Sequence, residues 1–209
     1  MSAFLGPIHH WLYHKILWYE GLVGEMLAMR EIDGALRDSL VGEMEVRYGG
    51  PAAGELSGAI THDNIHGWLQ ERIHSVESRM AFLVTELLKR GAIPFQSLEN
   101  LCREYAHRTA EALEVPAGTP EELFKIIYDH LIEGMPCDAI NQPVMAQEGI
   151  FGWKENRCLH EDYWNQVAGD VNHYYRLRKA LIEGFVLASG GKMVFELQSD
   201  GTKVIREVV

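Results

Sequence analysis

The stretch that decides the fold is residues 61–89, THDNIHGWLQERIHSVESRMAFLVTELLK. With about 100° of rotation per residue, its apolar side chains fall on one stripe, as in a helix that packs against a core. Asp63 is the expected N-cap, because its carboxylate can accept hydrogen bonds from the backbone N–H groups of the first turn. The sequence therefore predicts one long helix here, with a buried stripe made of Ile65, Leu69, Ile73, Val76, Met80, Leu83 and Leu87.

Two histidines interrupt this apolar pattern. His62 projects near the centre of the stripe, His66 lies at its edge one turn later, and Glu77 follows along the same flank. Histidines four residues apart share a helix face and can chelate one metal ion. The segment His-Asp-Asn-Ile-His lacks the glutamate of the HExxH motif, so a zinc protease is not indicated.

The same phrase occurs earlier in the chain. Residues 8–20 and 65–77 share the pattern I-H-x-W-L-x-x-[K/R]-I-x-x-x-E. Pro7 suits the first position of a helix, so His9, like His66, is expected near the third helical residue. There the helix macrodipole disfavours positive charge and favours a neutral imidazole that can bind a metal. Duplication of a helical packing unit without chemistry explains the repeat equally well.

Composition limits the class of protein. The 209 residues suit one domain, with 47% apolar and 23% charged residues. A net charge of −11 without a basic run argues against nucleic acid as a partner. The apolar runs are too short to span a membrane, and residues 1–20 lack the core of a signal peptide, so we expect a cytoplasmic protein. Cys102, Cys137 and Cys158 are too widely spaced for a disulfide framework or a CxxC zinc site.

The remaining elements are also predicted from periodicity and from cap residues. The expected helices cover residues 7–30, 35–47 (with a break or a bend near Gly34), 98–113, 120–133 and 158–188. Residues 135–157 are expected to be irregular, either a mobile cover over a pocket or a passive connection. Period-two segments at 193–198 and 203–208 flank Asp200-Gly201, which is typical of a hairpin turn.

These elements predict an all-α fold, a bundle of about five to six helices over residues 1–190, with a C-terminal β-hairpin over 191–209. Because a lone hairpin is only marginally stable in water, it should pack on the bundle or on a second subunit. A homo-oligomer is therefore a possible assembly. His160, Asp170 and Arg178 project into the apolar stripe of the last helix, so Asp170 and Arg178 should have partners and could pair with each other.

The favoured function is binding of a transition metal (zinc, iron or nickel) or of haem, for sensing, redox or small-molecule chemistry. If the helices alternate in direction, His9 and His66 lie at one end of two parallel helices, and His160 joins them. His62 and His66 are the first ligand candidates, followed by His9 and His160, with Glu77 or Asp170 as a ligand or a supporting group.

Two alternatives stay open. The first is a pocket without metal for a small anionic or aromatic ligand, lined by His130, Asp170, Tyr174 and Arg178, together with His62, His66, His160 and Tyr163. The second is a cysteine nucleophile, Cys137 or Cys158, activated by His130 or His160.

Overall fold

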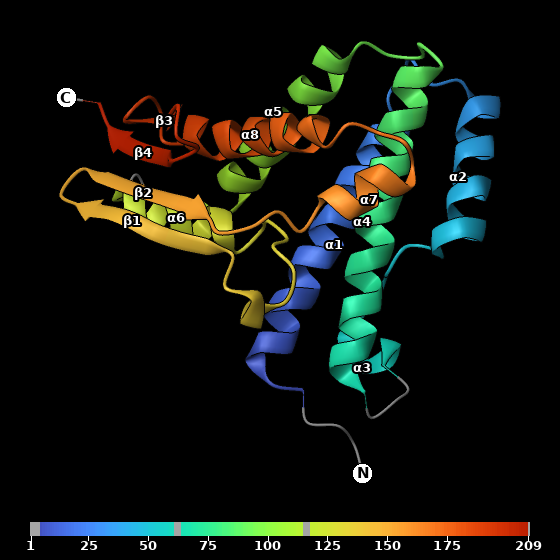
Figure 1. Ribbon diagram of the computed structural model, residues 1–209, viewed down its shortest axis with the longest axis horizontal. Helices are drawn as coiled ribbons and strands as arrows, with labels where there is room; N and C mark the ends of the chain where they lie inside the picture. The colour runs from blue at the N-terminus through green and yellow to red at the C-terminus, as the bar shows by residue number, and fades with distance from the viewer. Residues whose placement is uncertain (1–4, 61–63, 115–117, 209) are drawn as a thin grey trace. The chain divides into compact units, whose positions relative to one another are not determined.

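The computed structural model describes residues 5–60, 64–114 and 118–208 (Figure 1). The chain forms two compact units, each assembled from two separate stretches of sequence. Unit 1 comprises Met1–Phe95 and His160–Val171, and unit 2 comprises Gln96–Leu159 and Asn172–Val209. Within the described residues, no helix is both long and apolar enough to cross a membrane.

Unit 1 is built around two long helices, α1 (Pro7–Leu27) and α4 (Ile65–Lys89). These helices lie side by side and run parallel, because His9 contacts His66 near both N-termini and Glu20 contacts Arg79 further along (Figure 1). Three further helices complete the unit: α2 (Gly34–Tyr48), α3 (Leu56–Ala59) and α7 (Glu161–Gln166). Of these, α2 and α7 pack against α4.

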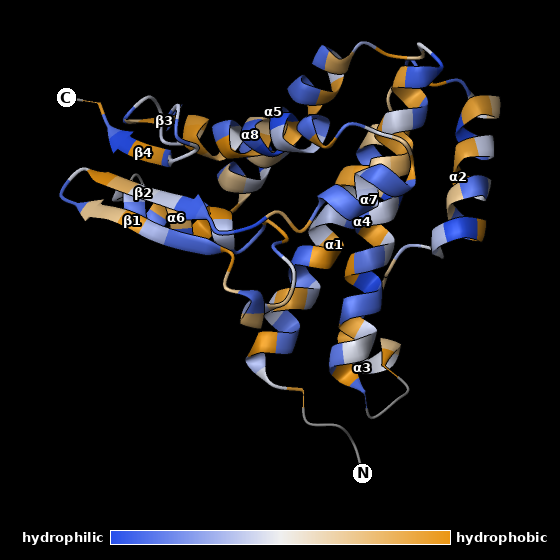
Figure 2. Ribbon diagram, viewed as in Figure 1, coloured by the Kyte–Doolittle hydropathy of each residue, from blue (hydrophilic) through white to orange (hydrophobic). Residues whose placement is uncertain are grey.

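The stripe predicted for α4 is confirmed, since all seven of its apolar residues are buried. The helix also buries polar side chains, among them Glu77 and Arg79, because it is covered by neighbours on more than one side. Figure 2 shows hydrophilic residues alternating with hydrophobic ones along both α1 and α4. The carboxamide of Asn64 caps the helix by accepting a hydrogen bond from Gly67 N at 2.9 Å. The expected cap, Asp63, lies outside the described residues.

Unit 2 combines helices with an antiparallel sheet. Its helices are α5 (Phe95–Ala112), α6 (Pro120–Tyr128), the short 3₁₀ helix η1 (Pro136–Asp138) and α8 (Val171–Leu187). Its strands are β1 (Asn141–Gln147), β2 (Ile150–Glu155), β3 (Met193–Leu197) and β4 (Lys203–Glu207), in the order β1-β2-β4-β3. Apolar side chains of β2 pack on α6, with the ring of Phe124 4.7 Å from Phe151 and 4.8 Å from Trp153.

The all-α expectation is wrong in part. The chain is mostly helical and its C-terminal hairpin forms, but the described residues hold eight α-helices and a four-stranded sheet. Residues 141–155, expected to be irregular, form a hairpin that turns through Gly149 at φ +72° and pairs with the C-terminal hairpin. The helix break near Gly34 is real, and the Asp33 carboxylate caps α2 by accepting from Leu36 N at 2.8 Å.

The single helix expected over residues 158–188 is also wrong, because the chain breaks between α7 and α8. Ala168 adopts φ +51°, and the backbone of Gly169 lies so close to Thr85 and Trp164 that a Cβ there would clash with them. Asp170 consequently precedes α8 and is exposed, and does not project into a buried stripe. A positive φ at a non-glycine residue is costly, so local packing rather than sequence pattern sets this break.

Candidate functional site

The two repeated histidines meet at the start of α1 and α4. His9 Nε2 lies 3.0 Å from His66 Nε2, and the ring centroids are 5.1 Å apart. His9 Nδ1 accepts a hydrogen bond from Gly6 N at 3.0 Å, so the proton of this imidazole sits on Nε2 and is donated to His66. Burial lowers the pKa of His9, and charge on His66 or His10 lowers it further. His62, the other predicted ligand on this flank, lies outside the described residues.

This histidine pair could supply two ligands to one metal ion. Metal–nitrogen bonds near 2.0–2.1 Å bring two ligand nitrogens of one ion to a separation of about 3 Å. Coordination through His9 Nε2 would move the proton to Nδ1, where it would face the N–H of Gly6 and break that hydrogen bond. Within the described ranges, no group of three or more His, Cys, Asp or Glu side chains is placed to hold a metal.

The other two predicted ligands of unit 1 lie elsewhere. His160 Nδ1 is 3.3 Å from Glu77 Oε2, and both side chains are buried. Glu77 follows His66 by eleven residues, which corresponds to about 16 Å along α4. The predicted set of histidines and Glu77 therefore divides between two separate places in unit 1.

The repeat is preserved in part in three dimensions. In each copy a cation one turn after the tryptophan lies over its ring, with Lys15 3.6 Å from the Trp11 centroid and Arg72 5.8 Å from that of Trp68. The glutamates that close the two copies differ in their partners. Glu20 pairs with Arg79 and accepts from the backbone N–H of Ala52, whereas Glu77 pairs with His160.

A cavity of about 320 Å³ lies in unit 2 between α8 and the sheet. Its lining combines cationic side chains with apolar ones and comes from α8, β2, β3, β4 and the turn between β3 and β4. The lining residues are Lys154, Glu155, Tyr175, Arg178, Lys179, Ile182, Phe195, Leu197, Asp200, Gly201 and Lys203.

One wall of this cavity contains a group of ion pairs, named here the Arg178 cluster. It consists of the lining residues Arg178, Glu155 and Lys203, together with Glu133, which pairs with Arg178 outside the lining. Arg178, 3% exposed, pairs through Nη1 with Glu133 and through Nε with Glu155 at 3.1 Å. The Lys203 ammonium lies 2.9 Å from the same Glu155. Burial lowers the pKa of Lys203 and nearby Arg178 lowers it further, while Glu155 opposes that shift. Opposite charges held in this way fix the wall and its lysine in place.

The opening of the cavity carries more exposed ion pairs. Lys154 Nζ is 2.8 Å from Asp200 Oδ2, and this lysine together with Thr202 lowers the pKa of Asp200. Lys179 pairs with Glu183, which also lies 2.7 Å from the guanidinium of Arg103. Although burial opposes the shift, these two cations lower the pKa of Glu183.

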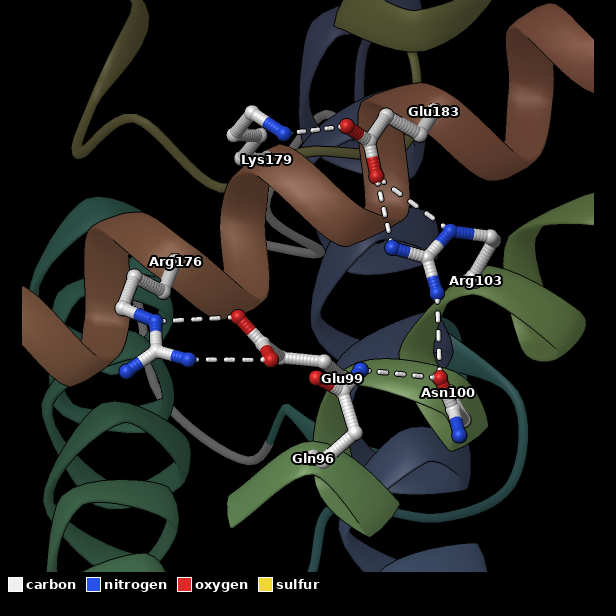
Figure 3. A network of polar contacts seen from close by, with 7 residues as sticks. All are labelled: Gln96, Glu99, Asn100, Arg103, Arg176, Lys179 and Glu183. Carbon is white, nitrogen blue, oxygen red and sulfur yellow. Dashed lines mark hydrogen bonds and ion pairs between the residues drawn. The ribbon is translucent and has the colours of Figure 1, made fainter.

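Lys179 belongs to a network that joins α8 to α5 beside the cavity (Figure 3). In the same network, Arg176 of α8 makes two parallel contacts with the carboxylate of Glu99, at 2.9 and 3.0 Å. Such paired contacts fix the geometry of a guanidinium and a carboxylate. The network therefore holds α8, and with it Lys179, in a defined position relative to α5.

One of the four predicted ligand-binding residues lines this cavity, namely Arg178. His130 is buried elsewhere, with Nδ1 2.8 Å from the carbonyl oxygen of Ile126 and its ring against Phe185. Tyr174 is buried and its neighbour Tyr175 lines the cavity instead, while Asp170 belongs to unit 1.

Sequence reasoning missed Glu155 because its strand was not predicted, and missed Lys203 because alternation alone does not show what a strand residue faces.

The two exposed cysteines remain candidates without geometric support. Cys137 and Cys158 are exposed, whereas the histidines proposed to activate them, His130 and His160, are buried.

Comparison of the chain with protein-family models, with curated proteins and with solved structures gives no significant match.

Proposed function

We propose that unit 2 binds a small organic anion with an apolar body in the cavity between α8 and the sheet. The observation that carries this proposal is the charge of the lining, where four cations (Lys154, Arg178, Lys179 and Lys203) outnumber two acids (Glu155 and Asp200). Two of these cations also pair with acids outside the lining, Arg178 with Glu133 and Lys179 with Glu183, so the preference for an anion comes from the cationic groups that face the cavity.

The cations divide into a fixed wall and an adaptable opening. Arg178 and Lys203 are held by the carboxylates of Glu133 and Glu155 and set the electrostatic potential of the cavity. Lys154 and Lys179 are 39% and 47% exposed, and ion pairs at such sites contribute about 0–1 kcal/mol. Their ammonium groups can therefore turn from Asp200 and Glu183 to a bound anion at small cost.

The rest of the lining suits an apolar group. Tyr175, Ile182, Phe195 and Leu197 present aromatic and aliphatic surface beside the cations. A volume of about 320 Å³ lies at the small end of ligand pockets. The ligand class that fits is a small aromatic or branched aliphatic carboxylate, which could be bound for regulation or as a substrate.

Calorimetric titration with phenylacetate and with its neutral isostere phenylacetamide tests this proposal. We expect the carboxylate to bind at least about tenfold more tightly, because only the carboxylate gains from the cations. The double variant Lys154→Gln/Lys179→Gln should raise the Kd for phenylacetate about tenfold and leave that for the amide unchanged.

Lys125→Gln is the matched control, because Lys125 forms an exposed pair with a glutamate four residues away, Glu121, as Lys179 does with Glu183. Arg178 is unsuitable as the test variant, since its removal would leave Glu133 buried without this partner. Equal binding of acid and amide, or equal loss in Lys125→Gln, would contradict the proposal.

A second proposal concerns unit 1, where the separation of 3.0 Å between the Nε2 atoms of His9 and His66 favours a site for zinc, nickel or iron. Elemental analysis of untagged protein incubated with each metal should show stoichiometric metal in the wild type. It should show little in the variant His62→Ala/His66→Ala, while His107→Ala, at a half-buried histidine of unit 2, serves as control. Full occupancy in the double variant would refute this site.

A further inference from the structure

The two edges of the sheet in unit 2 differ in how they resist pairing with another strand. The edge strand β1 contains Pro143, and its register shifts between Pro143 and Met145, so a bulge and a proline interrupt its outer face. Both devices are known to protect sheet edges. The opposite edge strand, β3, reads MVFEL and contains neither proline nor lysine, and its pairing with β4 is regular.

The register shows which backbone groups of β3 face outward. Val208 N donates to the carbonyl of Lys192 and Gln198 N donates to that of Thr202, so even-numbered residues face β4. In an antiparallel ladder the residues between them direct their N–H and C=O groups away from the partner strand. Those residues are Met193, Phe195 and Leu197, of which Met193 N already donates to Ser189 Oγ at 3.1 Å.

A groove of about 320 Å³ runs along this edge. It is lined by Arg103, Glu183, Val186, Leu187, Gly191, Met193, Val194 and Phe195. Leu187, at the end of α8, is 54% exposed in this groove, and Leu197, at the end of β3, is 52% exposed. The edge therefore offers an apolar hollow at one end of β3 and an exposed apolar side chain at the other.

We propose that β3 pairs antiparallel with β3 of a second copy of this chain, around a two-fold axis at Phe195. This register sets Phe195 opposite itself and Leu197 of one copy opposite Met193 of the other. Directly opposite residues present their side chains on the same face of a sheet. Leu197 of each copy then enters the groove beside Met193 and Leu187 of the other.

This register satisfies main-chain hydrogen bonds and sets no like charges directly opposite each other. The pairing forms about four main-chain hydrogen bonds, from Phe195 N–H to the opposite Phe195 carbonyl and from Leu197 N–H to the opposite Met193 carbonyl. It uses no Met193 N–H, which is already engaged. Glu196 comes opposite Val194, so no like charges are placed face to face. The contact is isologous, so it closes as a dimer and does not propagate.

Analytical ultracentrifugation over a concentration series tests this inference. A five-residue strand makes a small contact, so we expect a reversible dimer with a Kd in the range of about 0.1–1 mM. Leu197→Lys should raise that Kd at least about tenfold, because it places a charge in the apolar groove of the other copy. Val144→Lys is the matched control, because Val144 is equally exposed (53%) on the opposite edge strand.

Amide hydrogen exchange locates the contact independently of any variant. The N–H groups of Phe195 and Leu197 should exchange more slowly in concentrated than in dilute protein, whereas those of β1 should not change. A chain that stays monomeric at about 1 mM, or a dimer that Leu197→Lys leaves intact, overturns the inference.

Discussion

At the scale of single residues, the sequence repeat brings His9 and His66 together, and the pKa of His9 is lowered in this contact. The repeat placed His9 and His66 at equivalent helix starts, and the structure brings their Nε2 atoms within hydrogen-bond distance. What the repeat could not show is the acceptor role of His9 Nδ1 toward Gly6, because a helix start does not fix the rotamer of its third residue. That hydrogen bond places the proton of His9 on Nε2, and metal binding through Nε2 would have to break it.

The lowered pKa of His9 predicts how stability responds to acid. As pH falls through the ordinary histidine value of 6.5, the unfolded chain binds a proton that folded His9 resists, so the free energy of unfolding decreases. His9→Gln removes this titration, while its side-chain oxygen can still accept from Gly6 N–H. Urea unfolding between pH 7 and pH 5 should therefore show a smaller loss of stability in His9→Gln than in wild type. An equal loss would assign the pH dependence to other groups.

At the scale of elements, the long amphipathic helices and the C-terminal hairpin were predictable from sequence, and the strands β1 and β2 were not. The stripe of α4 repeats at helical period over 25 residues, so its burial follows from sequence alone. The segment NQPVMAQ of β1 is polar, contains a proline and has no period-two pattern, so only pairing with β2 makes it a strand. The Arg178 cluster could not be predicted from sequence for the same reason, because Glu155 and Lys203 come together only when β2 pairs with β4.

The contact between α5 and α8 depends on a glycine that no local pattern requires. A Cβ at Gly184 would lie 2.2 Å from the carbonyl oxygen of Arg103 and 2.8 Å from the Ala106 side chain. Gly184→Ala should therefore destabilise the fold by about 1–3 kcal/mol in chemical unfolding, despite the better helix propensity of alanine. Gly24→Ala and Gly42→Ala are matched controls within helices, with no atom within 4 Å, and should stabilise by about 0.5–1 kcal/mol. Stabilisation in all three variants would show that α5 can move aside.

At the scale of the whole molecule, sequence order and spatial units disagree. The helices α4 and α7 belong to one unit although some seventy residues separate them in the sequence. Hydrophobic periodicity predicted the mainly helical class and composition shows the acidic charge, but neither could predict this interleaving, which depends on contacts between distant segments. It also could not show that a chain of net charge −11 concentrates four cations around one cavity.

That uneven distribution of charge predicts opposite responses of the two unit 2 proposals to salt. Raising NaCl from about 20 to about 300 mM shortens the screening length and weakens attraction between the lining cations and an anion. The Kd of phenylacetate should therefore rise several-fold, while that of phenylacetamide stays constant. Pairing of two β3 strands brings together two copies that each carry −11, so the same salt weakens their repulsion and should lower the dimer Kd. Calorimetry and ultracentrifugation on the same samples measure both constants. If both rise together, the dimer is held by charge contacts and not by the apolar edge of β3.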